Sequence, residues 1–149
     1  IGCEIYEPGI ASTIDKIEKK KLKNILIYPK NIFTLIDELK RNSIDKVFML
    51  YPDPWPKKKH FKRRLISKIF LKRLHKILKK NGMTLISTDS LSYLCAIFYE
   101  FSLNSNFEWA NKDASDCYKR PLEMIKSKYE RKADIEGNDK YFLKFKKIC

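Results

Sequence analysis

Short apolar runs alternate with amphipathic stretches along almost the whole of this 149-residue chain. In the amphipathic stretches apolar residues recur at the spacing of one helix face, whereas the apolar runs have the length of buried strands. We expect strands at residues 1–5, 25–28, 46–51, 83–87 and 141–145, and helices at 8–21, 31–41, 61–80 and 89–101. This order predicts an α/β fold in a single domain over residues 1–149, with a mostly parallel sheet and helices on both faces.

The positive charge is concentrated in one segment. The chain has 32 basic and 18 acidic residues, and twelve of the basic residues but none of the acidic ones lie between Lys57 and Lys80. A solvated lysine-rich face usually mixes both signs of charge. An unmixed block on an otherwise balanced domain therefore favours a polyanionic partner, with RNA or DNA first and a membrane surface second.

Three acidic residues, Glu4, Asp53 and Asp89, are expected at the carboxyl ends of strands. Ligands of parallel sheets bind beyond the carboxyl ends of the strands. Asp53 lies in the segment PDPWP (52–56), whose three prolines stiffen the loop. A stiff loop can hold Asp53 and Trp55 in place before a ligand arrives. In the alternative interpretation Asp53 forms a turn and Trp55 fills the core, and the sequence supports both about equally.

Basic residues follow this loop directly. If a helix begins near Phe61, then Lys62, Arg63 and Arg64 lie in its first turn. Cations there oppose the helix dipole at a cost of about 0.3–1 kcal/mol each. A bound phosphate would reverse this penalty, so the placement favours a nucleic acid ligand.

Several classes of protein are excluded by what the sequence lacks. No apolar run is long enough to span a membrane, and no signal peptide opens the chain. The four cysteines are far apart and form no CxxC pair, which is typical of reduced thiols in a cytosolic protein. His60 and His75 lack the clustered spacing of a metal site, so we expect no metal.

The segment PDPWPKKKHFKRRL resembles the central motif of the tRNA (guanine-N7-)-methyltransferases, the TrmB-like family. Three further segments agree in order, IGCE (1–4), STD (87–89) and SKYE (127–130), so the resemblance covers nearly the whole chain. It implies a Rossmann-like class I methyltransferase fold and a cytoplasmic enzyme that uses S-adenosyl-L-methionine. The implied partner is tRNA, methylated at N7 of a guanine in its variable loop.

The resemblance also assigns roles to individual residues. Glu4 matches the acidic residue that holds the ribose hydroxyls of the cofactor, and Asn31 falls near the adenine, where the family usually has aspartate. Asp53 matches the residue treated as catalytic and is expected to border the cofactor as well. The matched substrate-contacting positions are Lys57, Asp89, Ser127, Lys128, Tyr129 and Glu130. A stretch assigned to RNA contact is matched by Lys59, His60, Phe61, Lys62, Arg63 and Arg64.

Two of these residues have structural alternatives. Asp89 follows Thr88 at a strand end and opens a helix, so it could serve as an N-cap. Glu130 with Lys128 or Arg131 could be an ordinary surface ion pair, worth about 0–1 kcal/mol.

The family's glycine-rich loop has no counterpart in this sequence. Its four glycines, Gly2, Gly9, Gly82 and Gly137, form no Gly-x-Gly turn of the kind that cradles such a cofactor. We therefore expect a fragment or a truncated product without the first strand, the glycine loop and its helix. It should have an uncovered sheet edge or apolar face, low stability and weak methyl transfer. The alternative function is a catalytically incomplete remnant that still binds tRNA.

Overall fold

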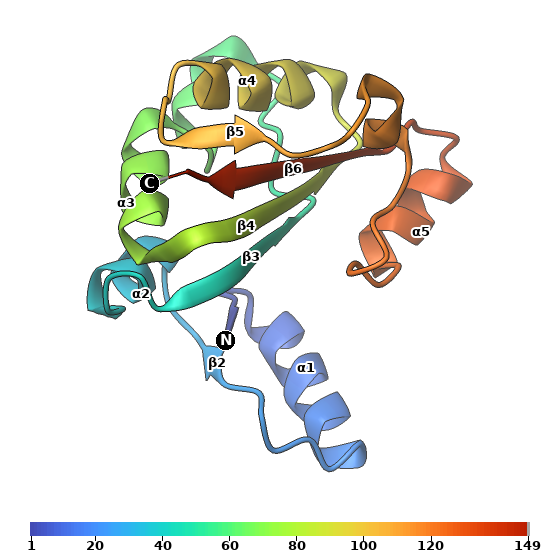
Figure 1. Cartoon of the computed structure of the whole chain (residues 1–149). Helices are drawn as coiled ribbons and strands as arrows, with labels where there is room; N and C mark the ends of the chain where they lie inside the picture. Colours follow the sequence, from blue (N-terminus) through green and yellow to red (C-terminus); the bar gives the residue numbers. More distant parts are fainter. Residues whose placement is uncertain (149) are drawn as a thin grey trace. The chain divides into compact units, whose positions relative to one another are not determined.

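The computed structural model describes residues 1–148, and the chain divides into two units (Figure 1). The first unit, Ile1–Lys40, contains β1 (Gly2–Cys3), α1 (Glu7–Lys19), β2 (Ile27–Tyr28) and α2 (Ile32–Glu38). The two strands pair in parallel, and α2 buries Leu35 and Ile36. Pro8 lies in the first turn of α1, where its missing N–H would have no helical partner.

The second unit begins at Arg41 and contains a four-stranded sheet with strand order β3-β4-β6-β5. In chain order its elements are β3 (Ile44–Leu50), the 3-10 helix η1 (Lys58–Arg63), α3 (Lys68–Ile77), β4 (Leu78–Thr88), α4 (Leu91–Ser102), β5 (Phe107–Trp109), the 3-10 helix η2 (Ala114–Tyr118), α5 (Lys128–Ile135) and β6 (Tyr141–Lys147). β3 runs parallel to β4, whereas β6 is antiparallel to both β4 and β5.

Side chains cover both faces of this sheet. On one face the ring of Phe101 from α4 stacks on Phe145 of β6, with ring centroids 3.7 Å apart. On the other face Met124 packs against Leu85 of β4. Phe145 pairs with Thr84, the neighbour of Leu85, and side chains alternate along a strand, so the two contacts lie on opposite sides. The predicted α/β class is confirmed, and the antiparallel pairing of β6 is a feature that the sequence did not predict.

The prediction of one helix over residues 61–80 is wrong. Residues 64–67 are not helical and separate η1 from α3, and Leu78 already begins β4. Ser67 caps α3, because its Oγ accepts the N–H of Phe70 at 3.4 Å. The helical spacing of apolar residues continues through the break, so periodicity alone could not locate it.

Gly82 lies inside β4. A Cβ atom at this position would lie 2.8 Å from the carbonyl oxygen of Lys79 and 3.3 Å from that of Asp45. Only glycine permits so close an approach of two backbones. The neighbouring Asn81 adopts a left-handed conformation with φ 62°, and the pairing of β3 with β4 is irregular between Ile44 and Lys46.

The other predicted elements are present with shifted ends. The helices predicted at 8–21, 31–41 and 89–101 are observed as α1, α2 and α4. The strands predicted at 1–5, 25–28, 46–51, 83–87 and 141–145 are observed as β1, β2, β3, β4 and β6. The sequence did not predict β5, η2 or α5, which lie in the less regular last third of the chain.

β3 is an edge strand of its sheet and presents apolar side chains to solvent. Phe48 and Leu50 are 44% and 43% exposed. Both point to the same face, because they lie two residues apart on one strand. This agrees with the uncovered apolar surface expected from the sequence.

Candidate functional site

The carboxyl ends of β3 and β4 bring two of the predicted site residues to one edge of the sheet. Leu50 pairs with Ser87 in parallel register, and the N–H of Tyr51 donates to the carbonyl oxygen of Ser87 at 2.9 Å. Asp53 follows β3 by three residues and is exposed, and Asp89 follows β4 directly and is half-buried. Ligands of α/β sheets bind at such an edge.

The loop that carries Asp53 is bounded by two strained residues. Tyr51 has φ 53° and Trp55 has φ 42°, and both lie in the left-handed region that bulky side chains rarely adopt. Such strain persists only where the surroundings hold it in place, and it concentrates at functional sites. The proline-rich sequence between these residues limits the loop further.

Arg64 holds this loop against the rest of the unit. It is 9% exposed, and its Nε donates to the carbonyl oxygen of Pro54 at 2.7 Å. The other guanidinium nitrogens donate to Ser92, to the carbonyl oxygen at 3.5 Å and to Oγ at 3.3 Å. The guanidinium also lies over the rings of Phe61, at 3.8 Å from the centroid, and Tyr93, at 5.1 Å. The sequence predicted an RNA contact for Arg64, whereas the structure turns its guanidinium inward.

The rest of the basic stretch lies in η1 and is exposed, apart from the partly exposed His60. Lys62 and Arg63 are in the last turn of η1, not in the first turn of a helix. The argument from an opposed helix dipole is therefore wrong. Trp55 meets His60 edge to face at 5.5 Å, and the guanidinium of Arg63 lies 4.9 Å from the Trp55 ring. Cation–π contact thus joins η1 to the loop of Asp53.

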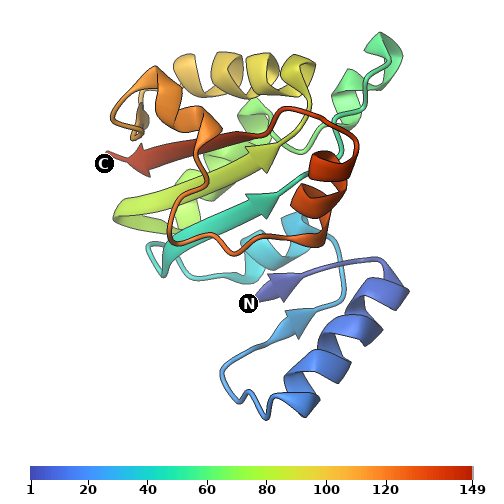
Figure 2. The same cartoon turned by 90° about the vertical axis from the view of Figure 1, so that its right-hand side faces the viewer.

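The SKYE segment begins α5 and faces the same edge (Figure 2). The Oγ of Ser127 caps the helix by accepting the N–H of Glu130 at 3.1 Å. Tyr129 stacks on Tyr51, with ring centroids 6.2 Å apart and an interplanar angle of 27°. The Lys128 amine lies 5.0 Å from the Tyr129 ring. The structure thus brings the SKYE segment next to Tyr51, the residue that follows β3.

Glu130 is a buried carboxylate rather than part of a surface pair. It is 7% exposed, and its Oε1 lies 3.5 Å from Nε of Arg120. The interpretation that paired it with Lys128 or Arg131 on the surface is therefore wrong. A buried carboxylate persists only with a compensating partner, which Arg120 supplies. The sequence carried no signal for Arg120.

Tyr51, like Arg120, is a residue of the candidate site that the sequence did not reveal. Among residues 1–148 no group hydrogen-bonds its buried hydroxyl. Burial raises the pKa of this hydroxyl well above its usual value, and the carboxylates of Glu130 and Asp89 raise it further. The raised pKa keeps this hydroxyl protonated.

Asp89 does not cap α4. The N-cap is Ser90, whose Oγ accepts the N–H of Tyr93 at 3.3 Å, while the N–H of Ser90 donates to Oγ1 of Thr88. The capping alternative for Asp89 is therefore wrong by one residue. Asp89 is the one residue between the end of β4 and the N-cap of α4.

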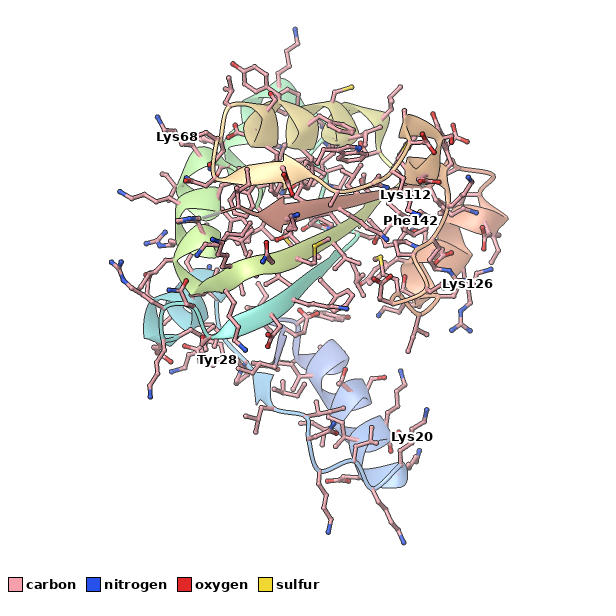
Figure 3. The ribbon with its side chains drawn as sticks, in the orientation of Figure 1. Lys20, Tyr28, Lys68, Lys112, Lys126 and Phe142 are labelled. Atoms are coloured by element: carbon pink, nitrogen blue, oxygen red, sulfur yellow. The ribbon has the colours of Figure 1, made fainter. Side chains whose placement is uncertain are left out.

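Two lysines fix α5 through one carboxylate. Asp134 accepts from Lys126 at 2.6 Å and also from Lys140. These two bonds lower the pKa of Asp134 to about 2. Lys126 comes from the segment before α5, and its label in Figure 3 lies beside that helix. The helix that carries Tyr129 and Glu130 is thus tied through Asp134 to the segments before and after it.

Glu4 and Asn31 belong to the first unit and follow its two paired strands. The Oε1 of Glu4 accepts the N–H groups of Ile5 at 2.8 Å and Tyr6 at 2.9 Å, which orients the exposed carboxylate. The Oδ1 of Asn31 caps α2 by accepting the N–H of Phe33 at 2.9 Å. Because β1 and β2 are parallel, both residues lie at the same end of this strand pair.

Two kinds of feature are absent from residues 1–148. Nowhere in this range do three or more His, Cys, Asp or Glu side chains gather as they would around a metal ion. No helix within it has the length and apolar character needed to cross a membrane.

Tyr51→Phe is expected to leave the free energy of unfolding unchanged or to raise it by up to about 1 kcal/mol, because it removes a buried hydroxyl without a partner. The matched control is Tyr93→Phe. The Tyr93 hydroxyl accepts the N–H of Ile66 at 3.2 Å, so its loss should cost about 1–2 kcal/mol. Urea unfolding followed by circular dichroism measures both. Equal losses in the two variants would contradict the assignment for Tyr51.

A parallel strand pair with helices packed on its sheet and acidic residues beyond its carboxyl ends is typical of Rossmann-like domains. Similarity to solved structures supports this fold. The chain is similar to the "Methyltransferase Homolog Protein" of Pyrococcus horikoshii, with a TM-score of 0.67 and 13% identity over 98% of this chain and 52% of that one. It is also similar to an SAM-dependent O-methyltransferase of Thermotoga maritima, with a TM-score of 0.58 and 13% identity over 99% and 49% of the two chains. The predicted Rossmann-like methyltransferase fold is confirmed.

The amino-acid sequence gives the family directly. The chain belongs to the family described as "Putative methyltransferase", whose model matches residues 1–143. It is 34% identical over 147 residues to the tRNA (guanine-N(7)-)-methyltransferase of Jannaschia sp. (strain CCS1), which covers 99% of this chain. The resemblance predicted from PDPWPKKKHFKRRL is thereby confirmed. The chain spans 62% of the length of that relative.

Proposed function

We propose that the protein formed by this chain transfers a methyl group from S-adenosyl-L-methionine to N7 of a guanine in the variable loop of tRNA. The observation that carries this proposal is the group of polar residues beyond β3 and β4. Asp53 lies there on a strained, anchored loop, and Tyr51 of the same loop stacks on the helix that carries Glu130. The proposed reaction is the one named for the relative from Jannaschia sp., a tRNA (guanine-N(7)-)-methyltransferase.

Guanine N7 needs no general base. Its lone pair is exposed on the major-groove edge of the base, so the nucleophile exists before the reaction begins. The remaining difficulties are alignment of N7 with the methyl donor and the positive charge that the purine gains. A rigid loop addresses the first difficulty, because fixed positioning replaces a random encounter. A carboxylate already in place addresses the second.

Asp53 suits the second role. Its carboxylate is exposed at the sheet edge, where a base can reach it, and the loop around it is fixed by Arg64. We assign it to orient the guanine through its N–H edge and to stabilise the developing charge, and not to accept a proton. Asp89 and Glu130 are proposed to share the guanine contacts, with Lys57, Ser127, Lys128 and Tyr129 as further substrate contacts.

The donor set of the first unit fits part of a cofactor site. The Glu4 carboxylate is exposed and oriented by two backbone N–H groups, both through Oε1. The same two bonds fix the orientation of Oε2, which can accept hydrogen bonds from ribose hydroxyls. Asn31 is proposed to lie near the adenine, and Asp53 to border the cofactor. Bound S-adenosylmethionine supplies a methyl group on a positively charged sulfur.

The RNA contact is proposed for the exposed side chains of the basic stretch. Lys59, Lys62 and Arg63 are exposed in η1, next to the loop of Asp53. Lysine and arginine on one short element suit phosphate oxygens, which fix the register of an RNA without reading its sequence. Partly exposed His60 and exposed Phe61 complete the proposed stretch.

The test is transfer of labelled methyl from S-adenosylmethionine to a tRNA transcript, followed by mapping of the modified base. We expect label at N7 of a guanine in the variable loop. A transcript with that guanine replaced by adenine is the matched control and should take up no label. Label at another atom would contradict the proposed reaction. Salt-sensitive tRNA binding without any transfer would instead support the catalytically incomplete remnant.

A further inference from the structure

A strongly basic cavity lies on α3, outside the site described above. Its volume is about 530 Å³, and six residues line it: Arg41, Ile69, Lys72, Arg73, His75 and Lys76. None of the six is acidic. We name it the α3 cavity. It contains none of the residues to which the resemblance assigns a role.

The α3 cavity runs along α3 and reaches the end of the sheet opposite to Asp53. α3 ends beside the starts of β3 and β4, whereas Asp53 and Asp89 follow the carboxyl ends of these strands (Figure 1). β3 has seven residues, so the two ends are separated by about 20 Å. A folded RNA is long enough to contact both.

The walls of the cavity are held by backbone and buried side-chain hydrogen bonds. The N–H of Asn42 donates to the carbonyl oxygen of Lys76 at 3.1 Å, which ties the segment of Arg41 to the end of α3. Lys147 is 4% exposed, and its Nζ donates to Oδ1 of Asn42 at 2.9 Å and to the carbonyl oxygens of His75 at 2.9 Å and Leu78 at 2.7 Å. These bonds fix the backbone that carries the basic side chains of the cavity.

Helix stability does not account for the surface cations. The buried ammonium of Lys147 already donates hydrogen bonds to the carbonyl oxygens of His75 and Leu78. The C-terminus of α3 therefore has a stabilising cation without the surface side chains. Lys68, Lys72 and Lys76 follow one another at i, i+4 spacing, and such like-charged pairs each cost about 0.2–0.5 kcal/mol. Lys68 is labelled on the outer side of α3 in Figure 3. An anion in the cavity would reverse this cost.

We infer that the α3 cavity binds phosphate groups of the tRNA backbone and is a second RNA contact, separate from the one at η1. This inference rests on the proposed function, because it takes RNA as the substrate. A concave basic surface concentrates positive potential, which attracts the phosphate groups of a nucleic acid. A flat anionic membrane would reach the rim of the cavity but not its floor.

The test compares tRNA affinity of the full 149-residue chain with that of the triple variant Lys72→Gln, Arg73→Gln, Lys76→Gln. The matched control, Lys16→Gln, Lys20→Gln, Lys23→Gln, removes the same charge from exposed positions in the first unit. We expect the α3 variant to bind an unmodified tRNA at least about tenfold more weakly near 0.1 M salt. Its slope of log affinity against log salt should fall by about 2, and the control should change both much less. Circular dichroism confirms that each variant is folded.

The outcomes separate this inference from the proposed function. Equal effects of the two triple variants would overturn the inference and leave the methyltransferase proposal intact. A loss of binding to phosphatidylserine vesicles with unchanged tRNA affinity would also overturn it, in favour of a membrane contact. If the wild-type chain binds no tRNA at any salt concentration, the proposed function fails, and the inference fails with it.

Discussion

Replacing Asp53 by asparagine is expected to lower kcat for methyl transfer to tRNA by about 100- to 1,000-fold, the usual effect of losing one preorganised electrostatic contact. Asparagine preserves the size of the side chain and one acceptor oxygen. It removes the negative charge that would stabilise the guanine as N7 becomes methylated. The measurement is initial rate with labelled S-adenosylmethionine at saturating tRNA.

Binding and stability should change little in this variant. Asp53 is exposed, so the free energy of unfolding should stay within about 0.5 kcal/mol of wild type. The tRNA affinity should stay within about threefold, since phosphate contacts dominate it. Asp15→Asn is the matched control, because Asp15 is an exposed carboxylate of α1 in an ion pair with Lys19. Its kcat should equal that of wild type.

The pH dependence distinguishes charge stabilisation from base catalysis. Because N7 carries its lone pair at neutral pH, we expect the wild-type and Asp53→Asn enzymes to share one pH profile across neutrality, differing only in height. A base role for Asp53 would give the wild type a titration that the variant lacks. Unchanged kcat in Asp53→Asn would remove this residue from the mechanism altogether.

The alternation of strands and helices was enough to predict that Asp53 and Asp89 follow neighbouring strands at one edge of the sheet. Parallel strands place their carboxyl ends at one edge, so Asp53 and Asp89 could be expected together before any coordinates were known. Proline is a strong local signal, so the stiff loop around Asp53 could also be predicted. These features depend on local sequence.

The contacts that complete the site depend on residues far apart in the chain. Tyr51 meets Tyr129, and Glu130 meets Arg120, through packing that no local pattern encodes. The break at residues 64–67 was missed for a related reason. Leu65 keeps the helical spacing of apolar residues, and only the inward turn of Arg64 shows that the chain is extended there.

Arg64→Ala is expected to lower the free energy of unfolding by about 2–4 kcal/mol, the largest stability effect that we predict. The substitution removes the donors to the Pro54 carbonyl and to Ser92, and it removes the cation between the rings of Phe61 and Tyr93. The buried carbonyl of Pro54 then loses its charged partner. Urea unfolding measured by circular dichroism gives the change.

Arg63→Ala is the matched control from the neighbouring position. Arg63 is exposed and lies over Trp55, so its loss should cost less than about 1 kcal/mol in stability. It should weaken tRNA binding more than Arg64→Ala does in folded protein, because its guanidinium is free to face solvent. Arg64→Lys should recover only part of the stability, since a single ammonium cannot bond Pro54 and Ser92 as the planar guanidinium does.

Loss of the Arg64 side chain should also lower the rate of methyl transfer, because Pro54 follows Asp53 directly in the chain. Without the bond from Arg64, the strained residues on either side of this loop can relax, and Asp53 loses its fixed position. We expect folded Arg64→Ala protein, assayed below its melting temperature, to have a kcat at least about tenfold lower at saturating tRNA. Full kcat in the folded variant would show that the loop keeps its shape unaided, and would limit Arg64 to stability alone.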